Sequence, residues 1–176
     1  GAKWLDKKYI EQFMYETFET PRYLRGQIEI SYVPYTAEWQ VSRKSMVRYN
    51  DVAAFTTYGT DRASAYRLLE DALNLRDIRI YDTIEDADGR ERRVLNAKET
   101  TLAAQKQQLI RDAFKDWIWK DPERRETLVR QYNEEMNSTR PREYDGSHIV
   151  FSGMNPEITL REHQKNAIAH VLYGGN

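Results

Sequence analysis

The sequence predicts an α+β fold, in which a small antiparallel sheet with covering helices is followed by a mainly helical C-terminal half. Strand-like segments occur in consecutive pairs, near residues 27–34 and 38–47 and near 77–84 and 91–96. Consecutive strands joined by short turns pair antiparallel, whereas parallel strands need long crossover connections. Helical periodicity dominates after these pairs.

Three parts follow from this division. We expect residues 3–96 to form an α+β subdomain, residues 97–140 a helical pair that packs on it, and residues 141–176 a connector and the first helix leading into a further domain that is absent here. At 176 residues with 40% hydrophobic content, the chain can bury a substantial core.

The first predicted helix begins after Asp6, whose side chain can accept hydrogen bonds from the free amides of the first turn. Apolar residues follow at helical spacing, namely Tyr9, Ile10, Phe13 and Phe18. Thr20-Pro21 ends this helix, because proline disfavours the helical conformation in the residue before it.

The first strand pair follows this helix. Gln27–Tyr35 alternates between apolar and polar residues, and Trp39–Val47 continues after Pro34 and a short turn. Asp51–Tyr58 fits neither a strand nor a helix clearly. Gly59 marks a turn.

A better-defined helix is expected after Gly59, with Asp61 as its cap and its end near Asn74. Its apolar face consists of Ala65, Leu68, Leu69, Ala72 and Leu73.

Beyond this helix, the Asp88-Gly89 pair is typical of a hairpin turn. Glu85, Asp86 and Asp88 near this turn suggest calcium, but they lack the twelve-residue loop spacing of helix–loop–helix calcium sites, so a solvated hairpin tip is the better interpretation.

Asn96 and Glu99 form a capping pair that opens the longest predicted helix, roughly 97–120. Its predicted buried stripe consists of Leu102, Leu109, Ile110, Ala113, Phe114 and Trp117. Asp121-Pro122 then provides a cap and a first helical residue. A second helix over about 122–137 would turn Leu128, Tyr132 and Met136 inward, although one kinked helix also fits the pattern.

The pattern of the final segment, residues 158–176, predicts another helix, from about Leu160 to Tyr173. Thr159 and Glu162 form a capping box, and a di-glycine follows. Gln164 falls on the apolar stripe, where a buried amide without partners costs about 1–3 kcal/mol. Either Gln164 lies at the solvated edge of the stripe, or its carboxamide reads the edge of a planar ligand such as adenine, since one amide donates and accepts side by side.

The segment L-R-E-H-Q-K-N-A-I, with G-M-N-P-E-I before it and a di-glycine after it, resembles the segment upstream of the nucleotide-binding loop in Swi/Snf-like superfamily 2 helicases. In that family a Leu-x-x-x-Gln motif contacts the adenine of ATP, which implies this role for Leu160 and Gln164. An upstream aromatic often stacks on the adenine, and Phe151 and Tyr144 are the candidates. The whole chain is similar to the stretch ahead of the helicase core in large helicase/DNA-methylase proteins of bacterial conjugative elements and phages, most strongly from about Asn96 onward.

This resemblance implies a parent protein that uses ATP and Mg²⁺, acts on DNA, and carries the helicase core on the same polypeptide. The sequence has no G-x-x-x-x-G-K-[ST] phosphate loop and no helicase-type Asp-Glu metal pair. The family's phosphate loop would begin a few residues beyond Asn176. We therefore expect no ATP hydrolysis, and no bound cofactor, in this fragment alone.

Composition limits the other possibilities. A net charge of −1 gives no global attraction to nucleic acid, so any DNA contact must be a local patch. The absence of cysteine rules out disulfides and thiolate metal sites and fits a reducing compartment. No signal peptide is recognised, and no apolar run approaches the roughly 20 residues of a membrane span, so we expect a soluble cytoplasmic protein without membrane contact.

One such local patch is present in the second strand-like segment. Arg43, Lys44 and Arg48 lie close in sequence to Trp39 and Tyr49. Basic residues beside aromatics can hold a phosphate backbone and stack a base. The alternative interpretation is a solvated strand edge with protective charges.

Catalytic motifs are not found. His163 and His170 lie seven residues apart without a third ligand at matching spacing, and no serine lies in G-x-S-x-G. Two function classes remain: a non-catalytic accessory part of a DNA helicase/methylase, or a protein–protein interaction or structural module that contacts neither nucleotide nor DNA.

Overall fold

The computed structural model describes residues 4–139, and its fold class is α+β, as the sequence predicts. The elements in chain order are α1 (Lys7–Thr17), β1 (Ile30–Val33), β2 (Glu38–Val41), a 3₁₀ turn η1 (Lys44–Met46), a π-helix η2 (Ala53–Thr57), α2 (Ala65–Leu73), β3 (Tyr81–Glu85), β4 (Glu91–Leu95), α3 (Ala97–Lys120) and α4 (Pro122–Thr139). No helix within the described residues is long and apolar enough to cross a membrane.

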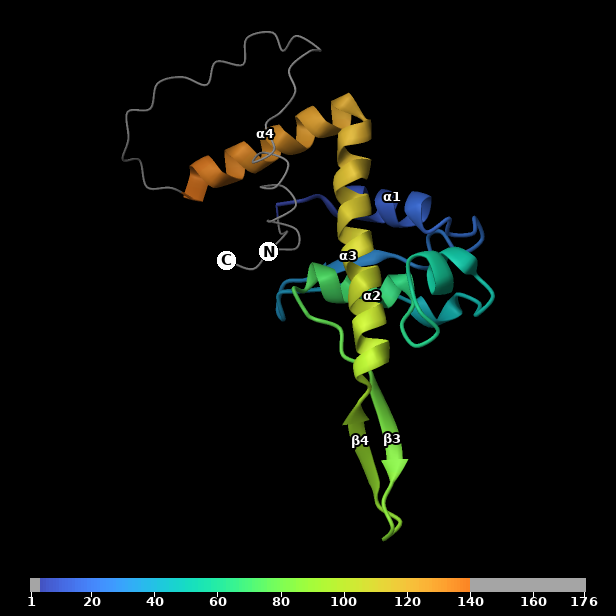
Figure 1. Ribbon diagram of the computed structural model, residues 1–176. Coiled ribbons are helices and arrows are strands. Elements are labelled where there is room, and N and C mark those ends of the chain that lie inside the picture. The colour runs from blue at the N-terminus through green and yellow to red at the C-terminus, as the bar shows by residue number, and fades with distance from the viewer. Residues whose placement is uncertain (1–3, 140–176) are drawn as a thin grey trace.

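Helix α3 is the spine of the molecule (Figure 1). Helices α1 and α2 pack against it, the β3–β4 hairpin projects beyond its N-terminal end, and α4 leaves its C-terminal end at a steep angle. Asp121 is extended (φ −108°, ψ 111°), and its carboxylate accepts a 3.1 Å hydrogen bond from the Arg124 amide. Because Asp121 breaks the helical conformation, α3 and α4 are two helices rather than one kinked helix.

The strands form two separate two-stranded antiparallel sheets, so the prediction of one sheet from four segments is wrong. The reason lies at the outer edge of β2. The Trp39 amide donates to the Asn74 side chain at 2.7 Å, and the Val41 amide donates to Glu70 at 2.7 Å. Since Glu70 of α2 and Asn74, the C-cap residue of α2, already satisfy this edge, no further strand can pair there.

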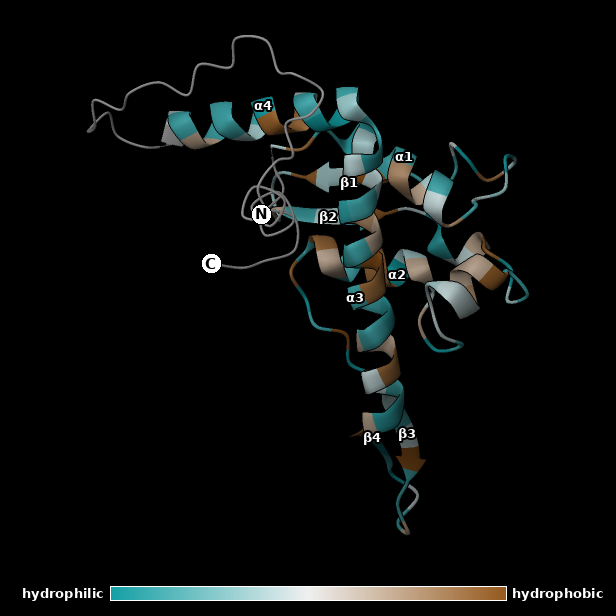
Figure 2. Ribbon diagram, turned by 45° about the horizontal axis from the view of Figure 1, so that its top comes forward, coloured by the Kyte–Doolittle hydropathy of each residue, from teal (hydrophilic) through white to brown (hydrophobic). Residues whose placement is uncertain are grey.

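The β3–β4 hairpin extends away from the core as an arm (Figures 1 and 2). Its register pairs Tyr81 with Leu95 and Glu85 with Glu91, and its turn contains Gly89 at φ +73°. Arg62 holds the base of the arm by donating to the Asp82 carboxylate and the Tyr81 carbonyl, each at 2.7 Å. Within β3 and β4, every residue is exposed except Asp82, which is partly buried. The predicted hairpin is confirmed, but it contributes little to the core.

The core is mostly aliphatic, and it contains a group of aromatic side chains from α1 and its C-terminal end, from α2 and from α3. Phe13 contacts Phe114 edge to face at a centroid distance of 4.9 Å, and Phe18 contacts Tyr66 in the same way at 5.2 Å. Tyr66 is fully buried, and its hydroxyl shares a 2.6 Å hydrogen bond with the buried Thr20 hydroxyl. Burial raises the pKa of Tyr66 to about 12, although the Thr20 hydrogen bond opposes this shift.

The buried stripe of α3 is only partly as predicted. Ile110, Phe114 and Trp117 are buried and Ala113 is half-buried, but Leu102 and Leu109 are 40% and 43% exposed. Ala103 and Gln107 are buried in place of these leucines. The predicted stripe is wrong at these two leucines because a polar residue, Gln107, occupies a buried position that an apolar pattern does not reveal.

Gln107 is accommodated because its amide nitrogen donates to two carbonyl oxygens. These belong to Leu68, at 3.4 Å, and Arg76, at 3.1 Å. The side chain is therefore buried with its donor satisfied, which removes most of the cost of burying an amide.

The helix caps are local and mostly follow the sequence. The side chains of Asp6 and Asn96 accept hydrogen bonds from the first turns of α1 and α3, as predicted. Ser64, not Asp61, caps α2, and its hydroxyl accepts from the Arg67 amide at 3.4 Å. The prediction is wrong because the chain makes a tight turn at Thr60, whose hydroxyl accepts from the Ala63 amide, before the helix begins.

Candidate functional site

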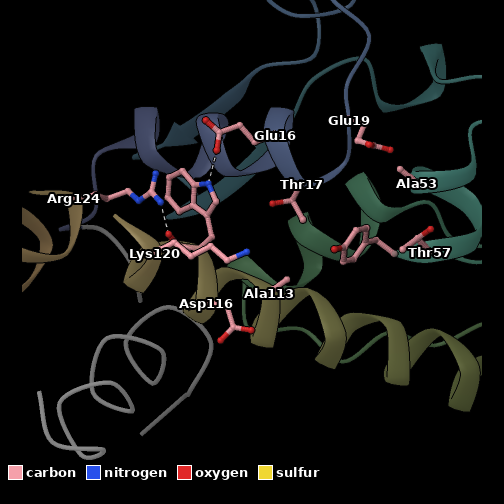
Figure 3. Close-up of a pocket in the computed structure, with 11 residues that line it drawn as sticks. Glu16, Thr17, Glu19, Ala53, Thr57, Ala113, Asp116, Lys120 and Arg124 are labelled. Atoms are coloured by element: carbon pink, nitrogen blue, oxygen red, sulfur yellow. Dashed lines mark hydrogen bonds between the residues drawn. The ribbon is translucent and has the colours of Figure 1, made fainter. Parts of the chain in front are cut away.

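An open cleft of about 620 Å³ lies between the C-terminal end of α1, the π-helix η2 and the C-terminal half of α3 (Figure 3). Its lining residues are Glu16, Thr17, Glu19, Ala53, Thr57, Tyr58, Ala113, Asp116, Trp117, Lys120 and Arg124. The cleft therefore mixes acidic, basic and aromatic side chains.

Glu16 and Arg124, which both line this cleft (Figure 3), each interact with Trp117. The Trp117 indole Nε1 donates a 2.6 Å hydrogen bond to Glu16 Oε2. The Arg124 guanidinium lies over the Trp117 ring, 3.4 Å from its centroid, and donates to the Trp117 carbonyl oxygen. The three residues come from α1, α3 and α4, so they join these helices.

The electrostatics of Glu16 fit this joining role. Burial alone would raise its pKa, but the hydrogen bonds from Trp117 and Gln12 and the charges of Arg124 and Arg25 hold the pKa below its usual value. The carboxylate is therefore ionised at neutral pH, and its oxygens already accept hydrogen bonds from Trp117 and Gln12. Because Glu16 and Arg124 are both engaged within the protein, we interpret the cleft as a structural junction between helices.

The predicted basic patch is rearranged by the fold. Trp39 is only 5% exposed and packs on Tyr32 at a centroid distance of 5.1 Å. Its indole cannot stack on a base, so this part of the predicted DNA site is wrong. Lys44 is half-buried and forms a 2.5 Å ion pair with Glu70, which engages its charge.

Arg43, Arg48 and Tyr49 are exposed, and we call them, together with Phe55, the basic–aromatic surface. Tyr49 is 80% exposed, and its ring stacks on Phe55 at a centroid distance of 5.0 Å with an interplanar angle of 21°. Phe55 is half-buried against the core. The exposed ring of Tyr49 is thus supported on one face by the ring of Phe55, which is itself packed against the core.

Phe55 was not predicted as part of this surface. It lies six residues after Tyr49, in the segment that fitted neither a helix nor a strand, and it belongs to η2. The exposed arginines and Tyr49 were visible in the sequence, but no local pattern indicates that the two rings stack.

The other predicted site residues, Gln164, Leu160 and Phe151, lie outside the described residues. Within residues 4–139, no group of three or more histidine or acidic side chains is arranged to hold a metal ion. The acidic hairpin tip at Glu85, Asp86 and Asp88 is part of this described region and is exposed.

Comparison with known proteins gives a family without an assigned activity. No curated protein and no solved structure matches the chain significantly. A family model, described as a domain of unknown function (DUF8437), matches residues 1–138, which span every described element except the last residue of α4. The chain therefore belongs to this family, DUF8437.

Proposed function

We propose that this chain is a non-catalytic accessory part of a cytoplasmic DNA helicase/methylase, with a DNA-contacting surface in its α+β domain. The observation that carries the proposal is the basic–aromatic surface. Arg43 and Arg48 are exposed and precede a supported, exposed aromatic ring, Tyr49, in a chain whose net charge is −1. Local cations of this kind can hold phosphates even where the whole protein has no basic field.

The fold weakens the alternative that these arginines protect a strand edge. Strand β2 ends at Val41, and the outer edge of β2 is satisfied by Asn74 and Glu70. Arg43 and Arg48 lie beyond the end of that strand. A protective role would place charges along the open edge itself.

The second part of the proposal concerns the segment around Gln164. The family match ends at residue 138, before this segment, which is consistent with a separate role for it. By resemblance to the Swi/Snf-like helicases, Leu160 and Gln164 would contact the adenine of ATP, with Phe151 as an aromatic candidate. ATP, Mg²⁺ and the catalytic residues would then belong to the helicase core of the same polypeptide.

DNA binding by the chain tests the first part. We expect a labelled 20-base-pair duplex or single strand, roughly the size of one protein footprint, to bind at low salt and to dissociate as salt rises. Arg43→Ala combined with Arg48→Ala should weaken binding and flatten the salt dependence. Arg79→Ala combined with Arg90→Ala removes two exposed arginines near or on the arm and serves as the control of equal charge. Equal loss in both double variants would mean that only net charge matters.

The gene that encodes the parent tests the second part. If a phosphate loop is encoded shortly after Asn176, the resemblance to a helicase is strengthened. If no phosphate loop follows, the helicase part of the proposal is withdrawn, and DNA binding by the domain must then be judged separately.

The second function class, a protein interaction module, is favoured by a different feature. The β3–β4 arm exposes apolar side chains to 36–48%, namely Tyr81, Ile84, Val94 and Leu95. A hairpin in water is only marginally stable by itself, and a partner surface would cover these residues. A variant with residues 83–93 replaced by a short glycine turn should keep the thermal stability of the core but lose association with the partner domain, if the arm is the contact.

A further inference from the structure

We infer that Tyr49 is a stacking platform for an unpaired base, so that the basic–aromatic surface selects single-stranded over double-stranded DNA. This inference rests on the proposed DNA contact and specifies the form of the DNA.

The position of Tyr49 is fixed by its turn. The Asp51 amide donates to the Arg48 carbonyl at 3.0 Å, so Tyr49 and Asn50 form the tip of a four-residue turn. The backbone is thereby held on both sides of the exposed ring.

The same turn also positions Phe55. The Asp51 side chain accepts from the Ala54 amide at 2.9 Å, and the Asp51 carbonyl accepts from the Phe55 amide at 3.0 Å. Asp51 therefore connects the turn to the start of η2. Since both rings are anchored through Asp51, their parallel arrangement is set before any ligand arrives, which lowers the entropy lost on binding.

The chemistry of an open ring face favours a flat ligand. One face of Tyr49 lies against Phe55, and at 80% exposure most of the remaining ring surface is accessible to solvent. A base stacked there would continue the column of rings, and Arg48, adjacent in sequence, can contact the following phosphate. Met46 and Val52 in the same stretch are 42% and 64% exposed and extend the apolar surface.

Stacking on Tyr49 requires an unpaired base. In a duplex both faces of each base are covered by neighbouring base pairs, and the outer surface presents phosphates and groove edges. A single strand exposes base faces at low cost. Phosphate contacts alone would serve both forms, so the preference for a single strand depends on the aromatic pair.

The experiment measures fluorescence anisotropy with a labelled oligo-dT of about 15 nucleotides, a length that covers a typical single-strand site. The matched ligands are the duplex of the same length and an abasic strand that keeps the phosphates but has no bases. We expect the full chain to bind oligo-dT more tightly than either. Tyr49→Ala should weaken oligo-dT binding by about 5- to 100-fold, the range of one lost base stack, and should barely affect the abasic strand.

The control variant is Tyr35→Ala. Tyr35 is 98% exposed in the β1–β2 turn, so its removal deletes an exposed tyrosine away from the basic–aromatic surface. Its oligo-dT affinity should equal that of the parent chain. Phe55→Leu, which removes the supporting ring, should show an intermediate loss, and circular dichroism melting should verify that each variant is folded.

The outcomes separate this inference from the proposed function. Equal affinity for duplex, abasic strand and oligo-dT, unchanged by Tyr49→Ala, would overturn the stacking role but leave a DNA contact through phosphates. No binding to any of the three ligands at low salt would overturn both. An equal loss in Tyr49→Ala and Tyr35→Ala would also overturn the stacking role, because the position of the ring would then be irrelevant.

Discussion

Trp117→Ala removes the side chain that joins three helices at the cleft. The indole is 7% exposed, packs edge to face on Phe13 at a centroid distance of 5.8 Å, and lies nearly parallel to Phe114 at 6.0 Å. Truncation of a buried tryptophan to alanine costs about 3–5 kcal/mol through lost burial and the cavity left behind. Arg124 also loses the ring that it covers, and Glu16 loses one of its two hydrogen-bond donors, the other being Gln12.

The size of this loss is large relative to the total stability of small domains, which is about 5–15 kcal/mol. We therefore expect Trp117→Ala to be among the most damaging single changes. Urea denaturation followed by circular dichroism measures the free energy of unfolding directly. A loss below about 1 kcal/mol would mean that Trp117 is not a core residue and that the packing of α1 against α3 is wrong.

Trp117→Phe separates the hydrogen bond from the packing. It keeps an aromatic ring but removes the Nε1 donor to Glu16. A hydrogen bond to a charged group contributes about 1.5–3 kcal/mol, and the partial exposure of Glu16 places the expected loss at the lower end. In a double-mutant cycle, Glu16→Gln should cost less in the Phe background than in the parent. Additive losses would show that the two side chains do not interact.

The same hydrogen bond predicts a pH dependence. Because the folded-state pKa of Glu16 is held below its usual value, its contribution to stability is fully present above the ordinary glutamate pKa of about 4.3. That contribution is lost as the pH falls through the lower, folded-state pKa. Denaturation measured between neutral and acidic pH should show a smaller acid-dependent loss in Glu16→Gln than in the parent, and identical slopes would contradict the prediction.

Further changes test the core and the turns. Tyr66→Phe removes one partner of the buried 2.6 Å hydrogen bond and leaves the Thr20 hydroxyl unsatisfied, so chemical denaturation should show a loss of about 1–3 kcal/mol. Gly59→Ala would place a methyl group 2.0 Å from the Ala54 carbonyl oxygen, and its melting temperature should fall sharply, with a loss of about 3 kcal/mol or more. Gly26→Ala is the matched control, since no atom lies within 4 Å and only its φ of +84° opposes a side chain, at about 1–2 kcal/mol. Equal losses at both glycines would contradict the close approach at Gly59.

Features that depend on neighbouring residues could be predicted from the sequence. The caps at Asp6 and Asn96 and the hairpin turn at Gly89 each involve residues within a few positions of one another. The periodicity of α1 and α2 likewise located their buried faces. Such signals are local, so they survive without knowledge of the tertiary structure.

Features that depend on distant partners could not be predicted. The burial of Trp39 depends on residues distant in sequence, namely Tyr32, on which its ring packs, and Asn74 after α2, which accepts from its backbone amide. The local sequence therefore made Trp39 look available for stacking. The separation of the two sheets has the same origin, since side chains of α2 and of its C-cap occupy the edge where another strand would pair. Phe55, on which Tyr49 stacks, lies in a π-helix, and no periodic pattern in the sequence predicts that helix.

The two interpretations of Gln164 differ in what accepts and donates at its amide, and Gln107 shows what the structural alternative entails. Gln107 lies on an apolar stripe and is satisfied by backbone carbonyl oxygens of Leu68 and Arg76, without any ligand. Its replacement by alanine should therefore cost about 1–3 kcal/mol of stability and leave nucleotide use unaffected.

If Gln164 instead reads adenine in the parent protein, Gln164→Ala should have the opposite effects. It should weaken ATP use by up to about a hundredfold, the value of a side-chain pair to a base edge, with little change in stability. GTP, which lacks the amino group of adenine, should be a poor substitute for the parent. Steady-state ATPase assays on the protein that includes the helicase core, with Gln107→Ala as the control, measure both effects. Equal ATP dependence in Gln164→Ala and the parent would assign Gln164 the same structural role that Gln107 already has, because an amide that contacts the nucleotide cannot be removed without changing the concentration of ATP that the enzyme requires.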